Sequence, residues 1–170
     1  MHYASIIFAF FPALCYIGVM KKTKEMPCCR SVCPIANALD ILGDRWTLLV
    51  IRDMMMFNKH EYHEFLAGSE KIATNILSDR LKRLLCLDVI RFKSHPDHKT
   101  KKLYYLTQKG KDLLPILVEL VLWGSEYHGS PEMPREGLNH LKRMKREPRK
   151  FMRGVLQGLS TWEKRNLNQK

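Results

Sequence analysis

The sequence predicts a mainly α fold of the α+β class, with several short helices, one β-hairpin and a longer apolar helix after it. Three observations predict this fold. Apolar residues recur every three or four positions through residues 34–85, two β-branched or aromatic runs flank a polar stretch at 94–100, and a second helical pattern fills 108–128. A chain of 170 residues has room for one core and a modest extension.

The first two helices are indicated by their boundary residues. Pro34 suits the first turn of a helix, and helical spacing of apolar residues continues until Gly43, which predicts a helix over 34–42. Asp44 can cap a second helix over 45–56. This second helix is too apolar for a surface position, so we expect it at the centre of the core.

The next two helices are joined by a short polar turn. A helix is predicted within 60–68 and another over 74–85, with the turn at 69–71. Two helices joined this tightly resemble a helix-turn-helix. The helix over 74–85 has one apolar side, and its opposite side either contacts nucleic acid or is simply solvated, as on most surface helices.

A hairpin follows these helices. Residues 89–93 and 103–106 predict two strands around the polar tip. The order helix, turn, helix, hairpin is that of a winged helix-turn-helix domain, in which the second helix enters the DNA major groove and the hairpin reaches the nearby backbone.

Residues near the start of 74–85 can reach base edges, while lysines and arginines further along and on the hairpin suit phosphates. We expect Asn75 to matter most. Arg80 borders the apolar side of its helix, so an internal ion pair competes with a phosphate contact. The predicted DNA-contacting residues are Thr74, Asn75, Ser78, Arg80, Lys82, Arg83, Lys93, Lys99, Lys101 and Lys102.

The final helix of this pattern, over 108–128 with Thr107 as its cap, carries more apolar surface than one small domain needs. Burial in the core of a single chain is one use of that surface. A two-fold dimer seam is the use we expect, because a single recognition helix gives weak specificity. The predicted seam residues are Leu113, Leu117, Leu120 and Trp123.

Charge is distributed unevenly along the chain. The 29 Lys and Arg residues exceed the 17 Asp and Glu residues by 12, which indicates a polyanionic partner. Residues 34–130 carry only +2 of this charge, whereas 135–170 carry +8. The apolar spacing in this basic C-terminal part predicts two short helices, the second broken by glycines. Its charge is a solvated run, an additional contact to the DNA backbone or an attachment to acidic lipid.

An apolar leader precedes the domain. Residues 3–20 are uncharged, and no basic residue stands before them, which argues against export. The leader is a gene-model extension upstream of a start at Met20, a membrane anchor or a loosely packed helix, of which we favour the first. Lys21 and the lysines after it would keep the body in the cytoplasm in each case.

The five cysteines are odd in number and crowded toward one end, which indicates free thiols in a reducing compartment. Cys33 directly precedes Pro34, and the helix dipole stabilises a thiolate there, so Cys33 is a candidate sensor of oxidants or electrophiles; simple packing of the thiol is the alternative. Cys28 and Cys29 lack a second pair at metal-binding spacing, so we expect no metal.

Sequence motifs for catalysis are missing. The chain has no phosphate-binding glycine loop, nucleophile elbow, paired-carboxylate or H-E-x-x-H pattern, so we expect neither an enzyme nor a bound cofactor. The prediction is a sequence-specific DNA-binding regulator. A basic RNA- or ribosome-associated protein and a membrane-tethered regulator are the alternatives.

Several segments between residues 33 and 128 carry a family resemblance in unbroken order: Cys33–Ala36, Ala38–Gly43, Arg45–Leu49, Ile51–Asp53, Leu77–Leu81, Tyr104–Thr107 with Gly110, Leu114–Pro115 and Trp123–Gly124. In these segments the sequence resembles the HxlR-type family of bacterial winged-helix transcriptional regulators, which are related to the MarR group. The resemblance implies a homodimer on an inverted-repeat operator, a recognition helix at 74–85, a wing at 94–101 and, as in several members, sensing through a cysteine near Cys33. It covers a winged-helix domain over 33–128, whereas the leader over 1–32 and the basic extension over 129–170 depart from the family pattern.

Overall fold

A computed structural model describes residues 31–95, 101–129, 133 and 135–167 of the chain. The leader at 3–20, Cys15, Cys28, Cys29 and most of the hairpin tip, including Lys99, lie outside the described residues. The chain forms two units, Met1–Asn37 and Ala38–Lys170. Among the described residues, no helix has the length and apolarity needed to span a membrane.

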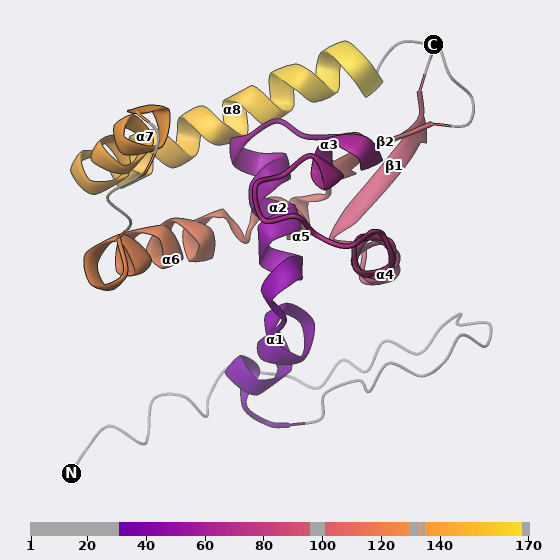
Figure 1. The fold of residues 1–170 in the computed structure, drawn as a ribbon, viewed down its shortest axis with the longest axis horizontal. Helices are drawn as coiled ribbons and strands as arrows, with labels where there is room; N and C mark the ends of the chain where they lie inside the picture. The colour runs from indigo at the N-terminus through magenta and orange to yellow at the C-terminus, as the bar shows by residue number, and fades with distance from the viewer. Residues whose placement is uncertain (1–30, 96–100, 130–132, 134, 168–170) are drawn as a thin grey trace, which may run out of the picture. The chain divides into compact units, whose positions relative to one another are not determined.

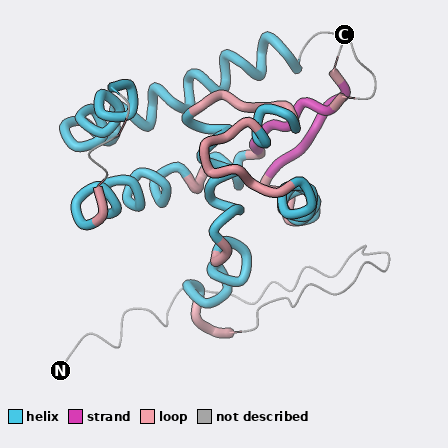
Figure 2. Tube along the Cα trace, in the orientation of Figure 1, coloured by secondary structure: helices cyan, strands magenta, loops and turns pink. Residues whose placement is uncertain are grey.

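The element order confirms the winged helix-turn-helix prediction (Figures 1 and 2). The helices are α1 (Pro34–Leu42), α2 (Arg45–Met56), α3 (Tyr62–Leu66), α4 (Thr74–Cys86), α5 (Gln108–Lys111), α6 (Leu114–Tyr127), α7 (Arg135–Arg146) and α8 (Pro148–Leu167), and the strands are β1 (Ile90–Ser94) and β2 (Lys102–Leu106).

Helix α2 begins at the predicted cap and is the central helix of its unit. The Asp44 carboxylate accepts hydrogen bonds from the backbone N–H groups of Trp46 and Thr47, both at 3.0 Å. Ile51 and Met54 are fully buried, as expected for a helix surrounded by α4, α6 and α8. Figure 1 shows α2 between α6 and α7 on one side and α4 with the hairpin on the other.

The hairpin pairs β1 with β2 in antiparallel register, with Phe92 opposite Tyr104. The segment before α3 is attached to the outer edge of β2: the Tyr104 N–H donates to the His60 carbonyl, and the His60 Nδ1 lies 2.8 Å from the Tyr104 carbonyl. The middle of β2 is therefore held to the segment before α3 by one backbone hydrogen bond and one bond from the His60 imidazole.

The prediction of a single helix over 108–128 is wrong, because the structure has two helices there, α5 and α6. Pro115 has no N–H to donate to the carbonyl of Lys111, and its ring would clash with that carbonyl in a continuous helix. Gly110 in α5 packs against the Val89 carbonyl so closely that any side chain would collide with it. Helix α5 is thereby held against the hairpin.

The C-terminal helices belong to the same core as the winged helix-turn-helix. Met144, Phe151 and Leu159 are buried in the cluster that also contains Ile51 of α2. The Trp162 ring stacks on His60, with ring centroids 3.4 Å apart. Helices α7 and α8 therefore pack on the core of the winged helix-turn-helix.

The expected break at the glycines of this region is also wrong. Helix α8 runs without interruption through Gly154 and Gly158. A glycine costs about 1 kcal/mol relative to alanine within a helix. Burial of Phe151 and Leu159 on both sides of the glycines outweighs that cost.

Candidate nucleic-acid interface

Helix α4 presents a polar face to solvent. Leu77, Leu81 and Leu84 are buried, while Thr74, Asn75 and, further along, Lys82 are exposed. These three exposed side chains make no hydrogen bond or ion pair with the residues that the structure describes. Polar groups at the start of a helix and without partners in the protein are available to a ligand.

Ser78 has a different environment, although it was predicted with this set. Its hydroxyl lies 2.8 Å from the hydroxyl of Tyr62 on α3. The Tyr62 hydroxyl also donates to the Thr74 carbonyl at 2.9 Å. Ser78 therefore helps to hold α3 against α4, and its hydroxyl is shared with that contact.

The turn that leads into α4 is held by a network of ion pairs. The buried Asp53 carboxylate accepts from Arg52 Nη2 and from Lys59 Nζ, both at 2.6 Å. The Arg52 guanidinium also reaches Glu70 in the turn, with Nη1 2.7 Å from the carboxylate. This hydrogen bond is the main reason that the pKa of Glu70 falls from 4.5 to about 2.

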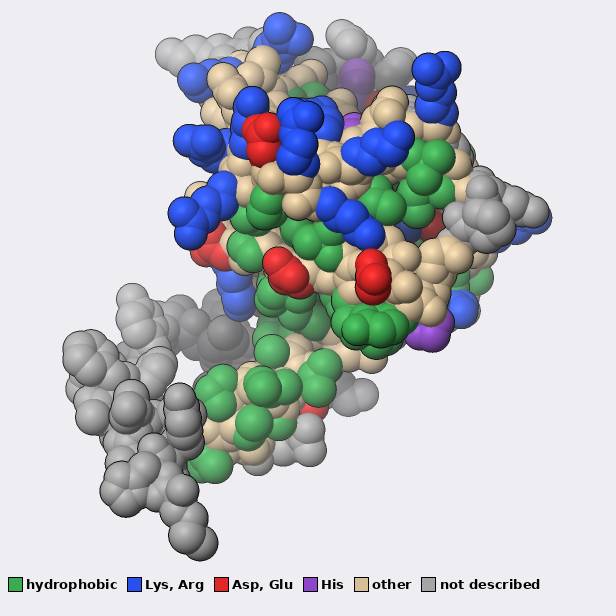
Figure 3. Space-filling view, turned by 90° about the vertical axis from the view of Figure 1, so that its left-hand side faces the viewer, with side chains coloured by type: hydrophobic (Ala, Val, Ile, Leu, Met, Phe, Trp, Pro, Cys, Tyr) green, Lys and Arg blue, Asp and Glu red, His purple; other side chains and the backbone are tan. Residues whose placement is uncertain are grey.

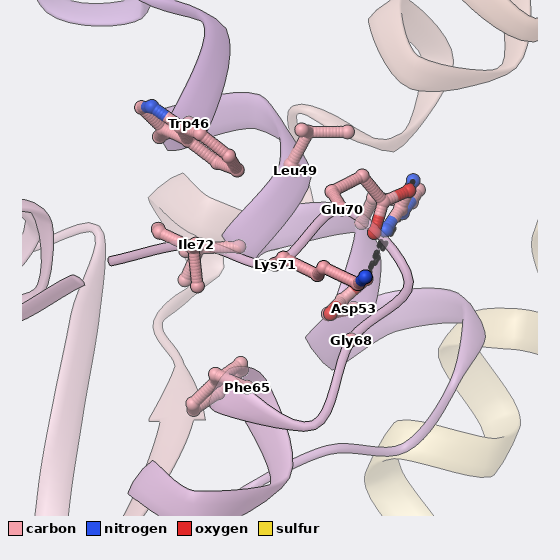
Figure 4. A pocket seen from close by; sticks show the side chains of 10 residues that line it. Trp46, Leu49, Asp53, Phe65, Gly68, Glu70, Lys71 and Ile72 are labelled. Carbon is pink, nitrogen blue, oxygen red and sulfur yellow. Dashed lines mark hydrogen bonds and ion pairs between the residues drawn. The ribbon is translucent and has the colours of Figure 1, made fainter. Parts of the chain in front are cut away.

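A small pocket lies beside this network (Figure 4). Trp46 and Leu49 of α2, Phe65 of α3 and Ile72 in the turn form its apolar wall, and the side chains of Asp53 and Glu70 lie on the other side. The pocket thus lies where α2 packs against the turn before α4.

Arg80 and Arg83 of α4 are engaged inside the protein. Arg80 pairs with Asp44 at 3.2 Å and with Asp79 at 3.4 Å, and the Arg83 guanidinium donates to the carbonyl of Asp40. Burial alone would raise the pKa of Asp44, but hydrogen bonds from Thr47 and the charge of Arg80 hold it below its ordinary value. The structure thus contains the internal ion pair of Arg80 that competes with a phosphate contact.

The wing lysines differ in their surroundings. Lys93 donates from Nζ to the carbonyl of Leu167, at 2.8 Å, near the end of α8. Lys101 lies 3.5 Å from the Glu61 carboxylate. Lys102 is exposed, and its ammonium lies 4.3 Å from the centre of the Phe92 ring. The exposed positions of Lys101 and Lys102 leave both able to contact phosphates.

Lys71 is a basic residue near α4 that the sequence reasoning did not select. It is exposed in the turn, with a positive φ of 53°. Its position three residues before α4 is the signal that could have identified it, since a lysine there lies next to the N-terminus of the expected recognition helix.

The predicted dimer residues do not share one face. Leu117 of α6 is buried in the core, and Leu113, directly before α6, packs partly against the core. Leu120 and Trp123 are exposed by 46% and 56%, and Ile116 and Tyr127 extend the same exposed stripe. Figure 3 shows hydrophobic side chains gathered on this side of the molecule, below a basic region.

Cys33 is exposed directly before α1. Within its unit, the backbone N–H of Cys33 donates to the Ser31 hydroxyl, and the Asn37 side chain bonds both backbone groups of Ser31. Cys86 is also exposed, at the end of α4. No group of three or more potential metal ligands occurs within the part of the chain that the structure describes.

The comparison with protein families decides the identity of this fold. The model for the HxlR-like helix-turn-helix matches residues 41–132. The chain belongs to this family. Its members and relatives are transcriptional regulators, which are not enzymes.

Relatives and solved structures agree with this family. The uncharacterized HTH-type transcriptional regulator MT3179 of Mycobacterium tuberculosis is 36% identical over 62% of this chain and 66% of its own length, and YvaP of Bacillus subtilis is 33% identical over 56% of this chain and 89% of its own. The chain thus spans slightly less than two thirds of the length of the mycobacterial relative.

Among solved structures, PA1607, a protein assigned as a transcription factor, has a TM-score of 0.54 and 32% identity, covering 62% of this chain and 72% of that one. A structure described as the redox regulator HypR in its oxidized form has a TM-score of 0.50 and 25% identity, covering 56% of this chain and 98% of that one. This HxlR-type chain is thus similar to solved regulators over more than half of its length.

The Arg52–Glu70 pair gives a pH-dependent stability. Because the pKa of Glu70 is depressed in the fold, its stabilising effect is complete above pH 4.5 and declines as the pH falls from 4.5 toward 2. Glu70 is partly exposed, so we expect Glu70→Gln to lower the free energy of unfolding at pH 7 by about 1 kcal/mol.

Urea unfolding of the wild type and Glu70→Gln at a series of pH values measures this difference, which should shrink below pH 4.5. In an Arg52→Gln background, the same substitution should have almost no effect. An equal effect of Glu70→Gln in both backgrounds would show that the pair does not stabilise the turn.

Proposed function

We propose that this HxlR-type regulator binds an inverted-repeat DNA operator as a homodimer, with α4 as the recognition helix. The observation that carries the proposal is the set of exposed and unpartnered side chains at Thr74, Asn75 and Lys82 of α4. In a major groove, an asparagine side chain can form two hydrogen bonds with an adenine edge, and lysine suits phosphates. The wing contributes Lys101 and Lys102 to the backbone next to the groove.

The arginines of α4 have a supporting role in this proposal. Arg80 and Arg83 fix α4 to Asp44 and to the carbonyl of Asp40, and Lys93 holds the wing strand against the end of α8. They orient the recognition helix and the wing, and the side chains that face solvent make the contacts with DNA.

Asn75→Ala tests base recognition. We expect operator affinity to fall at least about tenfold, since a two-bond base contact contributes about 1–3 kcal/mol of discrimination, while affinity for random duplex stays nearly constant. Lys82→Ala is the matched control on the same face, and should weaken both interactions equally while reducing the salt dependence by about one counterion.

Titration of the two variants against the operator, random duplex and structured RNA, followed by gel shift or fluorescence anisotropy, gives these affinities. Equal losses on operator and random duplex in Asn75→Ala would contradict base recognition by this residue. Preference of the wild type for structured RNA would favour the RNA-binding alternative.

The dimer is proposed to form through the exposed stripe on α6. Ile116, Leu120, Trp123 and Tyr127 are spaced at helical intervals and expose a continuous apolar surface. Pro115 and Glu119 border a groove on this face with the first three. A soluble chain that exposes such a stripe gains free energy by covering it, and a two-fold copy supplies the same stripe.

Trp123→Glu places a charge in this stripe, so we expect the dimer to dissociate at micromolar concentration, as measured by analytical ultracentrifugation. Operator affinity should fall with it. The control is Leu156→Glu, which places the same charge at a partly exposed leucine of α8 and should leave the dimer intact. A wild-type chain that sediments as a monomer, or a dimer that survives Trp123→Glu, would contradict this interface.

We also propose that Cys33 senses electrophiles or oxidants. Its exposure before α1 supports the proposal, as does the similarity to the solved redox regulator HypR. In a variant that keeps Cys33 as its single cysteine, alkylation of the thiol by iodoacetamide should weaken operator binding at least tenfold.

Replacement of Cys86 in that variant is essential, because alkylation on α4 could block DNA directly. The cysteine-free chain, treated in the same way, is the control and should keep its affinity. Full modification of Cys33, verified by mass spectrometry, with unchanged affinity would exclude the sensing role.

A further inference from the structure

The strongest charged feature outside α4 and the wing lies on α7 and the start of α8. Figure 3 shows Lys and Arg side chains gathered on this side of the molecule. We call the set the α7–α8 basic surface. Its exposed members are Lys142, Arg143, Lys145, Arg146, Arg149, Lys150 and Arg153.

Acidic side chains neutralise only part of this surface. Glu147 lies 3.0 Å from both Arg146 and Lys150, and Glu126 lies 3.2 Å from Lys145. Lys142, Arg149 and Arg153 make no ion pair or hydrogen bond with side chains in the described ranges. The surface therefore keeps a strong positive potential, which attracts a polyanion.

The basic side chains project from helices that are fixed to the protein. Met144 of α7 and Phe151 and Leu159 of α8 are buried in the core. Glu163 of α8 pairs with Lys111 at 2.8 Å. The charges are thus held in a fixed arrangement, unlike those of a flexible basic arm.

The location of the surface separates it from the recognition helix. Helix α7 packs against α6 and α8, whereas α4 packs against α2, α3 and β1. Figure 1 shows α7 and α4 on opposite sides of α2. A duplex that lies along α4 therefore does not reach the α7–α8 basic surface of the same chain.

We propose that the α7–α8 basic surface binds the phosphate backbone of a second DNA duplex, so that the regulator holds two duplex segments at once. This rests on the proposed function, which assigns the first duplex to α4. Lysine and arginine side chains that neutralise phosphates provide affinity without sequence preference.

A membrane surface fits these residues less well. A helix that lies on a bilayer inserts a broad apolar face between the lipids. On α7 and α8 themselves, the exposed large apolar side chains are Leu138 and Leu156, exposed by 40% and 38%, while Met144 points into the core. The two basic helices therefore carry no broad apolar face of their own, and the apolar stripe on α6 is assigned to the dimer.

The test uses the full chain with an immobilised operator duplex and a fluorescent random duplex in solution. The double variant Lys142→Gln and Arg149→Gln removes two unpaired charges of the surface. We expect it to reduce capture of the second duplex about tenfold at moderate salt, while operator affinity changes less than twofold. The control is Lys109→Gln with Lys164→Gln, which removes the same charge from other exposed positions and should leave capture unchanged.

Two outcomes would overturn the proposal. One is equal capture of the second duplex by the wild type and the Lys142/Arg149 variant. The other is a loss confined to binding of phosphatidylserine vesicles or of structured RNA in parallel assays. Operator affinity is measured in a separate titration. A wild-type chain that does not bind the operator would contradict the proposed function of α4. The effect of the Lys142/Arg149 variant on binding of random duplex would still test the basic surface.

Discussion

A buried carboxylate must be paired, and the pairing of Asp53 fixes the turn on which the recognition helix depends. Asp53 lies on the buried helix α2, and its oxygens accept from Arg52 and Lys59. The same Arg52 guanidinium reaches Glu70 in the turn before α4. The position of α4 relative to α2 is thus set by charge pairing in addition to the apolar contacts of its leucines.

The exposed face of α4 follows from these constraints. Arg80 pairs with Asp44, and Arg83 donates to the Asp40 carbonyl. These two contacts hold α4 in addition to the Arg52–Glu70 pair in the turn before it. The residues left at the surface, Thr74, Asn75 and Lys82, are then presented on a rigid helix. Helix α8 acts similarly on the hairpin, because Trp162 stacks on His60 and Lys93 donates to the Leu167 carbonyl.

Local signals explain which parts of the fold could be predicted. The Asp44 cap, the buried helix after it, the helix-turn-helix and the hairpin depend on short-range patterns, and each was predicted at nearly its observed position. The break between α5 and α6 also had a local signal in Pro115, which the apolar pattern across it concealed. Sequence periodicity could not tell which apolar face of α6 meets its own core, so Leu117 was grouped with Trp123 although the two lie on different faces.

Long-range contacts explain what could not be predicted. The stacking of Trp162 on His60 joins residues about one hundred positions apart, and no local pattern indicates it. The packing of α8 on α2 is also a long-range contact. It places the basic side chains of α7 and α8 on a folded surface, which the sequence pattern alone does not indicate. In the candidate site, Thr74, Asn75 and Lys82 are exposed, as the helical periodicity of α4 indicates. The partners of Ser78 on α3 and of Arg83 at the Asp40 carbonyl lie far away in the sequence, and no local pattern indicates them.

The proposed function depends on two copies of α4 that read a symmetric DNA site. Selection and sequencing of the duplexes that the full chain retains from a random library measures whether such a site exists. We expect an inverted repeat whose half-site centres lie about one helical turn, roughly 10 base pairs, or a multiple of that spacing apart. A single unrepeated half-site, or no enriched sequence at all, would contradict it.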